Sequence, residues 1–478
     1  MSILNPLTRR TALIVAAAAF MQMLDGAILN TSLPQMASSL GVQPVQMSVG
    51  ITTYMLVVAI FMPLSAWLTE RFGARRVFVG AILLFTFGSL ICGLSRSLPE
   101  FIASRILQGL GGAMMVPVGR IIVLHQASKQ ELLEANTFIT WPALVAPVIG
   151  PVLGGFITTY AGWRWNFLLN LPLGLAGSLL AWRYLPLTRS TQRDNLDWPG
   201  FIYTASALAL VLTGLESLGH GQITRPVPWL LIGIGVILAY FALRHLARTA
   251  TPLLSLKPFE RLSFALSTLS AGTWVRIAVS STPFLLPLLY QLGFGLSALE
   301  ASSFLFAYFI GNLGMKAITT RTLRRLGFRR VLFVDSLLCG LSIAACALFE
   351  ADTSRWLMFA SLFCAGLTRS MAFTSLASLA FADISQAERN SASTLASMFQ
   401  QLAMLLGVAV AALLLHLSQA LHGHSAPLLV DFRWAFGLMG VLAVIAAFQF
   451  LRLPLDAGNE ISGYKPKSAA ADSQAGQR

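Results

Sequence analysis

Four ionisable side chains lie deep inside long apolar segments of the chain, where a charge needs a partner or access to water. Asp25 lies within the apolar segment 11–33, and Arg105 lies within the segment 98–122. A carboxylate in such a place can bind and release a proton. We predict that Asp25 is a proton-binding residue and that Arg105 faces it or a cavity. The alternative is that the two side chains form a structural salt bridge.

Arg276 and Arg369 lie in the middle of the apolar segments 263–290 and 355–378. No carboxylate lies equally deep in this half of the sequence, so both cations need water or an anion. We predict that Arg276 and Arg369 bind an anionic substrate, such as a carboxylate or its metal chelate. The alternative is that both arginines donate hydrogen bonds to helix carbonyls.

Further candidates for a substrate site are basic, amide or aromatic side chains in apolar segments. Each has an ordinary explanation as well: basic side chains near span ends reach toward water, amides hydrogen-bond between helices, and aromatic rings pack or lie at the membrane interface. These candidates are Arg120, Lys316, Gln22, Gln400, Gln401, Trp141, Trp274 and Tyr290.

The composition of the 478-residue chain indicates a membrane protein that crosses the bilayer many times. Hydrophobic residues make up 56% of the chain and charged residues only 11%, whereas a soluble domain has about 25% charged residues. Apolar runs predict fourteen spanning helices, because hydrocarbon offers the backbone no other hydrogen-bond partner. They cover residues 11–33, 46–68, 77–95, 98–122, 137–158, 166–186, 199–218, 228–247, 263–290, 298–317, 330–349, 355–378, 391–416 and 433–453.

The loops account for the net charge of +14. An even number of spans places both termini on one side, and almost all loop Lys and Arg residues fall on that side. The exceptions are Arg96, Arg164, Arg225, Arg355 and Arg433. Positive charge accumulates in cytoplasmic loops, so we predict that both termini are cytoplasmic.

Two loops carry related basic sequences. TERFGARRV (Thr69–Val77) follows the second span, and RTLRRLGFRRV (Arg321–Val331) follows the tenth. A shift of eight spans fits two six-helix halves with two helices inserted between them. We therefore predict a six-helix bundle in 1–190, two linker helices in 191–262, a second six-helix bundle in 263–455 and a disordered cytoplasmic tail in 456–478.

Two spans carry motifs of small and polar residues. RILQGLGGAMMVPVGR in the fourth span places polar and small residues on one helix face: Arg105, Gln108, Gly109 and Gly112. APVIGPVLGG in the fifth span predicts a bent helix with a close packing face, made by Pro147, Gly150, Pro151, Gly154 and Gly155.

These motifs resemble the major facilitator superfamily, in particular its fourteen-helix drug:proton antiporters. RxxQG is similar to the motif B of that superfamily, and GPxxGG (Gly150–Gly155) is similar to its antiporter motif C. LDGAILNTSLP (Leu24–Pro34) and WRWNFLLNLPLG (Trp163–Gly174) resemble segments of the fourteen-helix branch. The run QGLGGAMMVPVGR resembles its MdtD-like subgroup of bacterial multidrug exporters.

The resemblance implies an all-α polytopic membrane protein of the 6+2+6 type, with two pseudo-symmetric six-helix bundles around a central cavity. It implies a proton-coupled antiporter that exports small molecules by alternating access in the bacterial inner membrane. Arg105 would then take part in proton coupling. The superfamily's usual multidrug substrates are lipophilic and often cationic, whereas the arginines of the second half favour an anionic or zwitterionic substrate. Both substrate classes stay open, as does a transporter-like sensor without net flux.

The loop motif A of the superfamily is present with two changes. Ala66 and Glu70 stand where the family has Gly and Asp, while Arg71, Gly73 and Arg75 match it. Glu keeps the negative charge, so the resemblance implies gating through a contact between Glu70 and an arginine. In the first-helix motif, Gly26 and Ala27 replace small hydroxyl residues.

Other protein classes are disfavoured. Cys92, Cys339, Cys346 and Cys364 all lie in apolar runs without a CxxC pair, and the histidines are scattered, so we expect no metal site and no cofactor. No lysine follows a glycine, so there is no nucleotide-binding P-loop. Neither paired carboxylates nor an acid–base cluster suggests an enzyme. The expected partners are a small-molecule substrate, protons and the lipid bilayer, with no nucleic acid, and we expect a monomer.

Overall fold

The described residues of the computed structural model are 5–126, 132–187, 196–219, 225–249, 252–385, 388–423 and 426–464. They form helices and no strand, and eleven helices are long and apolar enough to cross a membrane. The remaining predicted spans, 137–158, 166–186 and 298–317, lie on α6, on α7 with α8, and on α13. The all-α membrane fold is therefore confirmed.

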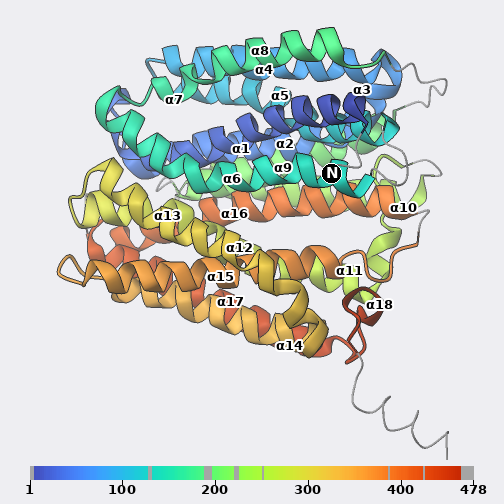
Figure 1. Cartoon of the computed structure of the whole chain (residues 1–478). Helices are drawn as coiled ribbons and strands as arrows, with labels where there is room; N and C mark the ends of the chain where they lie inside the picture. Colours follow the sequence, from blue (N-terminus) through green and yellow to red (C-terminus); the bar gives the residue numbers. More distant parts are fainter. Residues whose placement is uncertain are drawn as a thin grey trace, which may run out of the picture. The chain divides into compact units, whose positions relative to one another are not determined.

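The chain divides into two compact units. Unit 1 comprises 1–253, 283–306 and 408–429, and unit 2 comprises 254–282, 307–407 and 430–478. The helices up to residue 253 are α1 (Pro6–Leu40), α2 (Ser48–Phe61), α3 (Leu64–Phe72), α4 (Ala74–Leu94), α5 (Leu98–Gln126), α6 (Leu132–Tyr160), α7 (Trp165–Leu168), α8 (Asn170–Tyr184), α9 (Trp198–Gly219) and α10 (Pro226–Arg248). In unit 1, α1 packs on α6, and α4 packs on α5 and α8 (Figure 1).

The remaining helices begin after residue 253, and the unit boundaries cut through several of them. They are α11 (Leu262–Phe264), α12 (Ala271–Leu288), α13 (Ala298–Gly314), α14 (Lys316–Ala345), α15 (Arg355–Leu379), α16 (Arg389–His422), α17 (Leu429–Gln449) and α18 (Asn459–Ser462). Two π-helical segments flank α12, at Ala265–Leu269 and Leu289–Gly293.

The ends of α1 follow from its sequence. Asn5 precedes the helix and its side chain accepts a hydrogen bond from the Leu7 N–H, while Pro6 supplies a favourable φ at the first position. Gly41 ends the helix in the left-handed conformation at φ 68°. Local signals therefore define a helix of 35 residues, which is long enough to span a bilayer.

The two basic loop sequences share a backbone conformation. Gly73 separates α3 from α4 with φ 85° and ψ 138°, and Gly327 kinks α14 with φ 73° and ψ 163°. Glycine adopts this region readily, and other residues are strained there. The weak repeat in the sequence thus corresponds to the same bend in each unit.

α9 and α10 form a hairpin, and Asp197 joins the two ends of this hairpin. Its carboxylate accepts hydrogen bonds from the Gly200 N–H at 2.9 Å, the His245 side chain at 2.7 Å and the Leu253 N–H at 3.1 Å. Burial alone would raise the pKa of Asp197, but these hydrogen bonds outweigh it, so the pKa lies below its usual value. α9 also packs against α2, which attaches the hairpin to unit 1.

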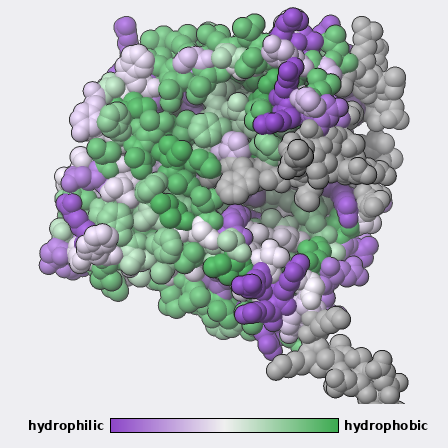
Figure 2. All heavy atoms as spheres, in the orientation of Figure 1, coloured by the Kyte–Doolittle hydropathy of each residue, from purple (hydrophilic) through white to green (hydrophobic). Residues whose placement is uncertain are grey.

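Large apolar side chains are exposed along several helices. Leu179 on α8 is 68% exposed and Leu341 on α14 is 61% exposed. Figure 2 shows hydrophobic residues over most of the visible face and hydrophilic residues mainly toward its edges. Such a surface is stable in a bilayer and unfavourable in water.

The predicted disordered tail, 456–478, contains a short ordered part. α18 packs on α14, where Tyr464 lies beside Gly327. A Cβ at position 327 would lie 2.9 Å from the Tyr464 ring, so the glycine makes room for this contact. Residues 465–478 lie outside the described range.

Candidate functional site

A buried ion pair joins α1 to α5. Asp25 Oδ2 lies 2.9 Å from Arg105 Nη1, and each side chain is 1% exposed. Both charges are thereby removed from solvent, which is tolerable only when the geometry is good and the remaining hydrogen bonds are made. The salt bridge that the sequence left open as an alternative is present.

Two amides hold the other oxygen of Asp25. Its Oδ1 accepts a hydrogen bond of 2.8 Å from Gln108 Nε2 and another of 2.8 Å from Asn170 Nδ2. Both amides also donate to Ser89 Oγ, at 2.7 Å from Gln108 and 3.2 Å from Asn170. The carboxylate therefore lies where α1, α4, α5 and α8 meet.

Arg105 has further partners on α2 and α5. Its Nε donates to Gly50 O at 3.0 Å, and Nη1 also donates to Gln108 Oε1. The guanidinium lies 4.3 Å from the centre of the Tyr54 ring, within the range of a cation–π contact. Arg105 therefore has neutral partners on α2 and α5 in addition to the carboxylate of Asp25.

The predicted packing glycines lie at close helix contacts. A Cβ on Gly109 would lie 2.9 Å from Val57 Cβ, and one on Gly112 would lie 2.6 Å from Tyr54 Oη. Gly112 also faces the buried Gln22, which thus lies beside the ion-pair cluster. These glycines bring α5 close to α1 and α2 and so place Arg105 against Asp25.

α6 uses its glycines on two faces. Cβ atoms on Gly150 and Gly154 would lie 2.6 Å from Ala27 Cβ and 2.8 Å from Ile28 O on α1. A Cβ on Gly155 would instead lie 2.7 Å from Ala298 O on α13. The prolines of the motif, Pro147 and Pro151, lie within the same continuous helix.

The arginines of the loop motif contact other residues of unit 1. The Arg71 guanidinium lies 5.5 Å from the Trp67 ring centre. Arg75 Nη1 donates to Leu185 O at 3.4 Å and lies over the Trp182 ring, at 4.7 Å. Arg75 thus joins the start of α4, after Gly73, to the end of α8. Glu70 is half-buried on α3.

Arg276 is buried in unit 2 and is 3% exposed. Its Nη1 donates a hydrogen bond of 2.6 Å to Ser267 O, in the π-helical segment that precedes α12. Its Nε has no hydrogen-bond partner among the described residues. Arg276 therefore donates a hydrogen bond to a helix carbonyl, which is the structural alternative to an anion site that the sequence left open.

Arg369 lies on α15 among aromatic rings. Its guanidinium is 5.5 Å from the centres of the Tyr308 and Phe309 rings and 5.3 Å from that of Phe373. Nη1 also donates to Tyr308 Oη at 3.4 Å. Arg369 is only partly buried, and no carboxylate of the described chain forms an ion pair with it.

The other predicted substrate residues belong to both units. Lys316 Nζ donates to Thr374 Oγ1 at 2.7 Å, Arg120 is exposed on α5, and Trp274 is 44% exposed. Tyr290 is fully buried and stacks on Phe304 at 4.6 Å. Gln400 and Gln401 are half-buried on α16, and the side chain of Trp141 lies outside the described part.

Sequence reasoning missed three members of the ion-pair cluster and the burial of carboxylates elsewhere, among them Asp335. Asn170 stands in the WRWNFLLNLPLG segment, so its motif was visible but its partner was not. Ser89 and Tyr54 carried no signal beyond being polar in an apolar run. Asp335 is buried in unit 2 at 7% exposure and lies near the start of the predicted span 330–349.

Comparisons with known proteins agree on the family. A family model described as Major Facilitator Superfamily matches residues 15–408 and 262–471. A relative from Pectobacterium carotovorum subsp. carotovorum (strain PC1), named "Putative multidrug resistance protein MdtD", is 39% identical over 449 residues, or 93% of this chain and 95% of that protein. The protein of that name from Escherichia coli (strain K12 / DH10B) is 37% identical over 471 residues, or 97% and 98% of the two chains.

A solved structure of similar fold is the crystal structure of a D-xylose-proton symporter. It has a TM-score of 0.66 and 15% sequence identity, and covers 94% of this chain and 99% of that one. At this identity the likeness concerns the fold alone.

Proposed function

Since this chain belongs to the major facilitator superfamily and is a multi-pass membrane transporter rather than an enzyme, we propose that it is a proton-coupled antiporter. It exports small molecules by alternating access from the cytoplasmic membrane of a bacterium. Both termini face the cytoplasm, and the protein acts as a monomer. In sequence order, it comprises a six-helix bundle, the α9–α10 hairpin and a second six-helix bundle.

The observation that carries this proposal is the buried Asp25 carboxylate, held by Arg105, Gln108 and Asn170. A proton on Asp25 would cancel the attraction to Arg105 and would weaken the two amide hydrogen bonds. α1 would then be bound less tightly to α5 and α8. Protonation thus biases the arrangement of the helices, and binding of substrate from the cytoplasm would favour release of the proton.

The test is transport by purified protein in vesicles with an imposed pH gradient. Asp25→Asn removes the charge and keeps the shape, so gradient-driven export should be lost while binding of substrate persists. Asp25→Glu should retain part of the activity. Asp352→Asn, at an exposed carboxylate in the turn before α15, is the matched control and should behave like the unchanged protein. Full gradient-driven export by Asp25→Asn would refute the proposal.

The substrate proposed here is an anionic or zwitterionic solute. Its support is Arg369, a partly exposed cation that has aromatic neighbours and no ion-pair partner in the described chain. Proton movement triggered by organic anions, alone or with a metal, should be lost in Arg369→Gln. Unchanged transport of every anion in a protein that lacks the charges of Arg276 and Arg369 would contradict the anion site.

A second candidate substrate class is the lipophilic cation. The relatives at 37–39% identity carry the name of a multidrug resistance protein. Proton movement triggered only by lipophilic cations would select this class and leave Arg369 a structural role. If neither organic anions nor lipophilic cations trigger proton movement, a membrane sensor without net flux is favoured.

A further inference from the structure

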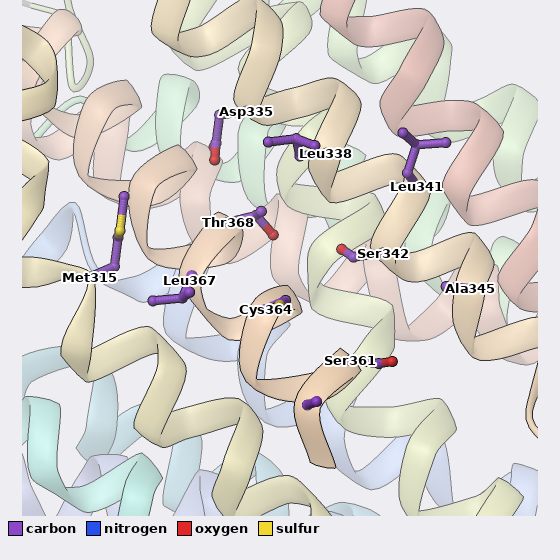
Figure 3. A pocket seen from close by; sticks show the side chains of 11 residues that line it. Met315, Asp335, Leu338, Leu341, Ser342, Ala345, Ser361, Cys364, Leu367 and Thr368 are labelled. Atoms are coloured by element: carbon purple, nitrogen blue, oxygen red, sulfur yellow. The ribbon is translucent and has the colours of Figure 1, made fainter. Parts of the chain in front are cut away.

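Unit 2 contains a cavity that the proposed transport mechanism does not use. It has a volume of about 690 Å³ and lies between α14 and α15, at the end of α13. Figure 3 shows side chains of both long helices around it, with Met315 contributed from the α13 end. Its walls are mainly apolar and include Leu338, Leu341 and Leu367.

One carboxylate lies in the wall of this cavity. Asp335 is 7% exposed, and its Oδ2 has no hydrogen-bond partner among the described residues. In Figure 3 its carboxyl end points toward the side where Thr368 lies. A buried carboxylate without a donor is costly, so the site is incomplete unless a donor or a proton arrives.

The hydroxyl groups around the cavity offer acceptors. Thr368 Oγ1 donates its proton to Ala365 O at 3.0 Å, and Ser342 Oγ donates to Cys339 O at 2.9 Å. Each hydroxyl has thus used its single donor within its own helix and retains only lone pairs. The lining therefore suits a ligand that carries a positive charge and several N–H donors.

The neighbouring basic residues of the protein are committed elsewhere. Lys316 follows the cavity residue Met315 but donates to Thr374, and Arg369 follows Thr368 but lies among aromatic rings. None of the arginines around Gly327 forms an ion pair with Asp335 in the described structure. The carboxylate is therefore available to an external cation.

The cavity also has an apolar edge at the surface. Leu338 is 48% exposed and Leu341 is 61% exposed, on a helix that crosses the membrane. A hydrocarbon chain could lie along these side chains while its head group reached Asp335. We propose that this cavity binds amphiphilic compounds with a primary or secondary ammonium head group, which enter from the bilayer.

A cysteine in the lining supplies the readout. Cys364 lines the cavity and is exposed, whereas Cys92, Cys339 and Cys346 are buried. The full-length protein is placed in phosphatidylcholine vesicles, and the rate of Cys364 alkylation by N-ethylmaleimide is measured with and without n-octylammonium. Cys364→Ser identifies the labelled position.

n-Octylammonium should slow the alkylation several-fold, and Asp335→Asn should abolish this protection. n-Octyltrimethylammonium, which has no N–H donor, should protect less, and n-octanol should not protect. Equal protection of Asp335→Asn, equal protection by n-octanol or n-octyltrimethylammonium, or no protection at all would overturn the proposal.

Two further experiments complete the test of this site. Thr368→Val keeps the carboxylate and removes one acceptor, so it should lose part of the protection, which tests the site even if Asp335→Asn does not fold. Protection in vesicles that contain phosphatidylethanolamine and no added n-octylammonium, lost in Asp335→Asn, would support the site and name a lipid as its occupant. Asp25→Asn should be protected like the unchanged protein, since this site is independent of the proposed proton coupling.

Discussion

At the scale of single residues, the Asp25 cluster combines one negative charge, one positive charge and neutral amide donors among fully buried side chains. Gln108 and Asn170 both donate to the same oxygen of Asp25. Hydrogen bonds to a charged group are worth about 1.5–3 kcal/mol, against about 0.5–1.5 kcal/mol for neutral ones. The cost of removing an amide here therefore depends on the charge of Asp25.

Two buried asparagines in one sequence segment allow a matched comparison. Asn170→Leu should lower the free energy of unfolding by about 1.5–3 kcal/mol, because Asp25 loses a donor. In the Asp25→Asn background the same change should cost less. The measurement is a double-mutant cycle on thermal unfolding in detergent.

Asn166→Leu is the control for this cycle. The Asn166 side chain donates to Ser32 Oγ at 2.7 Å and to Thr158 Oγ1 at 2.9 Å, both neutral acceptors. Its effect should therefore add to that of Asp25→Asn without coupling. If the effect of Asn170→Leu also added to that of Asp25→Asn, the contact between Asn170 and Asp25 would contribute no charge-dependent energy.

At the scale of helices, glycines set the distances on which the site depends. A Cβ on Gly88 of α4 would lie 2.6 Å from the backbone nitrogen of Gln108, and one on Gly111 of α5 would lie 2.5 Å from that of Phe85. α4 and α5 thus touch through their backbones. A side chain between them would move Gln108 and with it a donor to Asp25.

α4 offers its own control for this argument. Gly88→Ala should lower the free energy of unfolding by about 1–3 kcal/mol through overpacking. Gly80→Ala should be neutral or stabilising, by about 0.5–1 kcal/mol, because nothing lies within 4 Å of a Cβ there. Thermal unfolding of both variants in detergent checks this. Equal midpoints would show that α4 and α5 separate at no cost.

At the scale of the whole molecule, the distribution of positive charge predicts how the chain crosses the bilayer. The motif loop around Gly73 is expected in the cytoplasm, and the turn before α15 is expected outside. Single cysteines introduced by Arg76→Cys and Asp352→Cys, in a Cys364→Ser background, test this. Both positions are exposed.

A membrane-impermeant maleimide should label the Asp352→Cys protein in right-side-out vesicles. It should label the Arg76→Cys protein only after permeabilisation. The reverse pattern would place both termini outside, and labelling of both positions in sealed vesicles would contradict the odd number of spans predicted between residues 76 and 352.

The sequence alone determined the family and the helical membrane fold, and it offered the Asp25–Arg105 pair as one of two alternatives. Each of these follows from local or averaged properties: apolar runs long enough to span hydrocarbon, charges that such runs tolerate only when paired, and short motifs of small residues. The repeated glycines at 73 and 327 were visible for the same reason, because a φ near 80° restricts the residue type directly.

Tertiary structure decided which partner each polar group has. Asn170, Ser89 and Tyr54 join the ion-pair cluster from three helices, and the hydrogen bond from Asn170 to Asp25 spans 145 positions in sequence, so no spacing rule connects them. Arg276 and Arg369 looked equivalent in the sequence, yet one binds a helix carbonyl and the other lies among aromatic rings. Asp335 lies near the start of a predicted span and is nevertheless buried. Periodicity fixes the face of a helix, but the packing of neighbouring helices determines what that face meets.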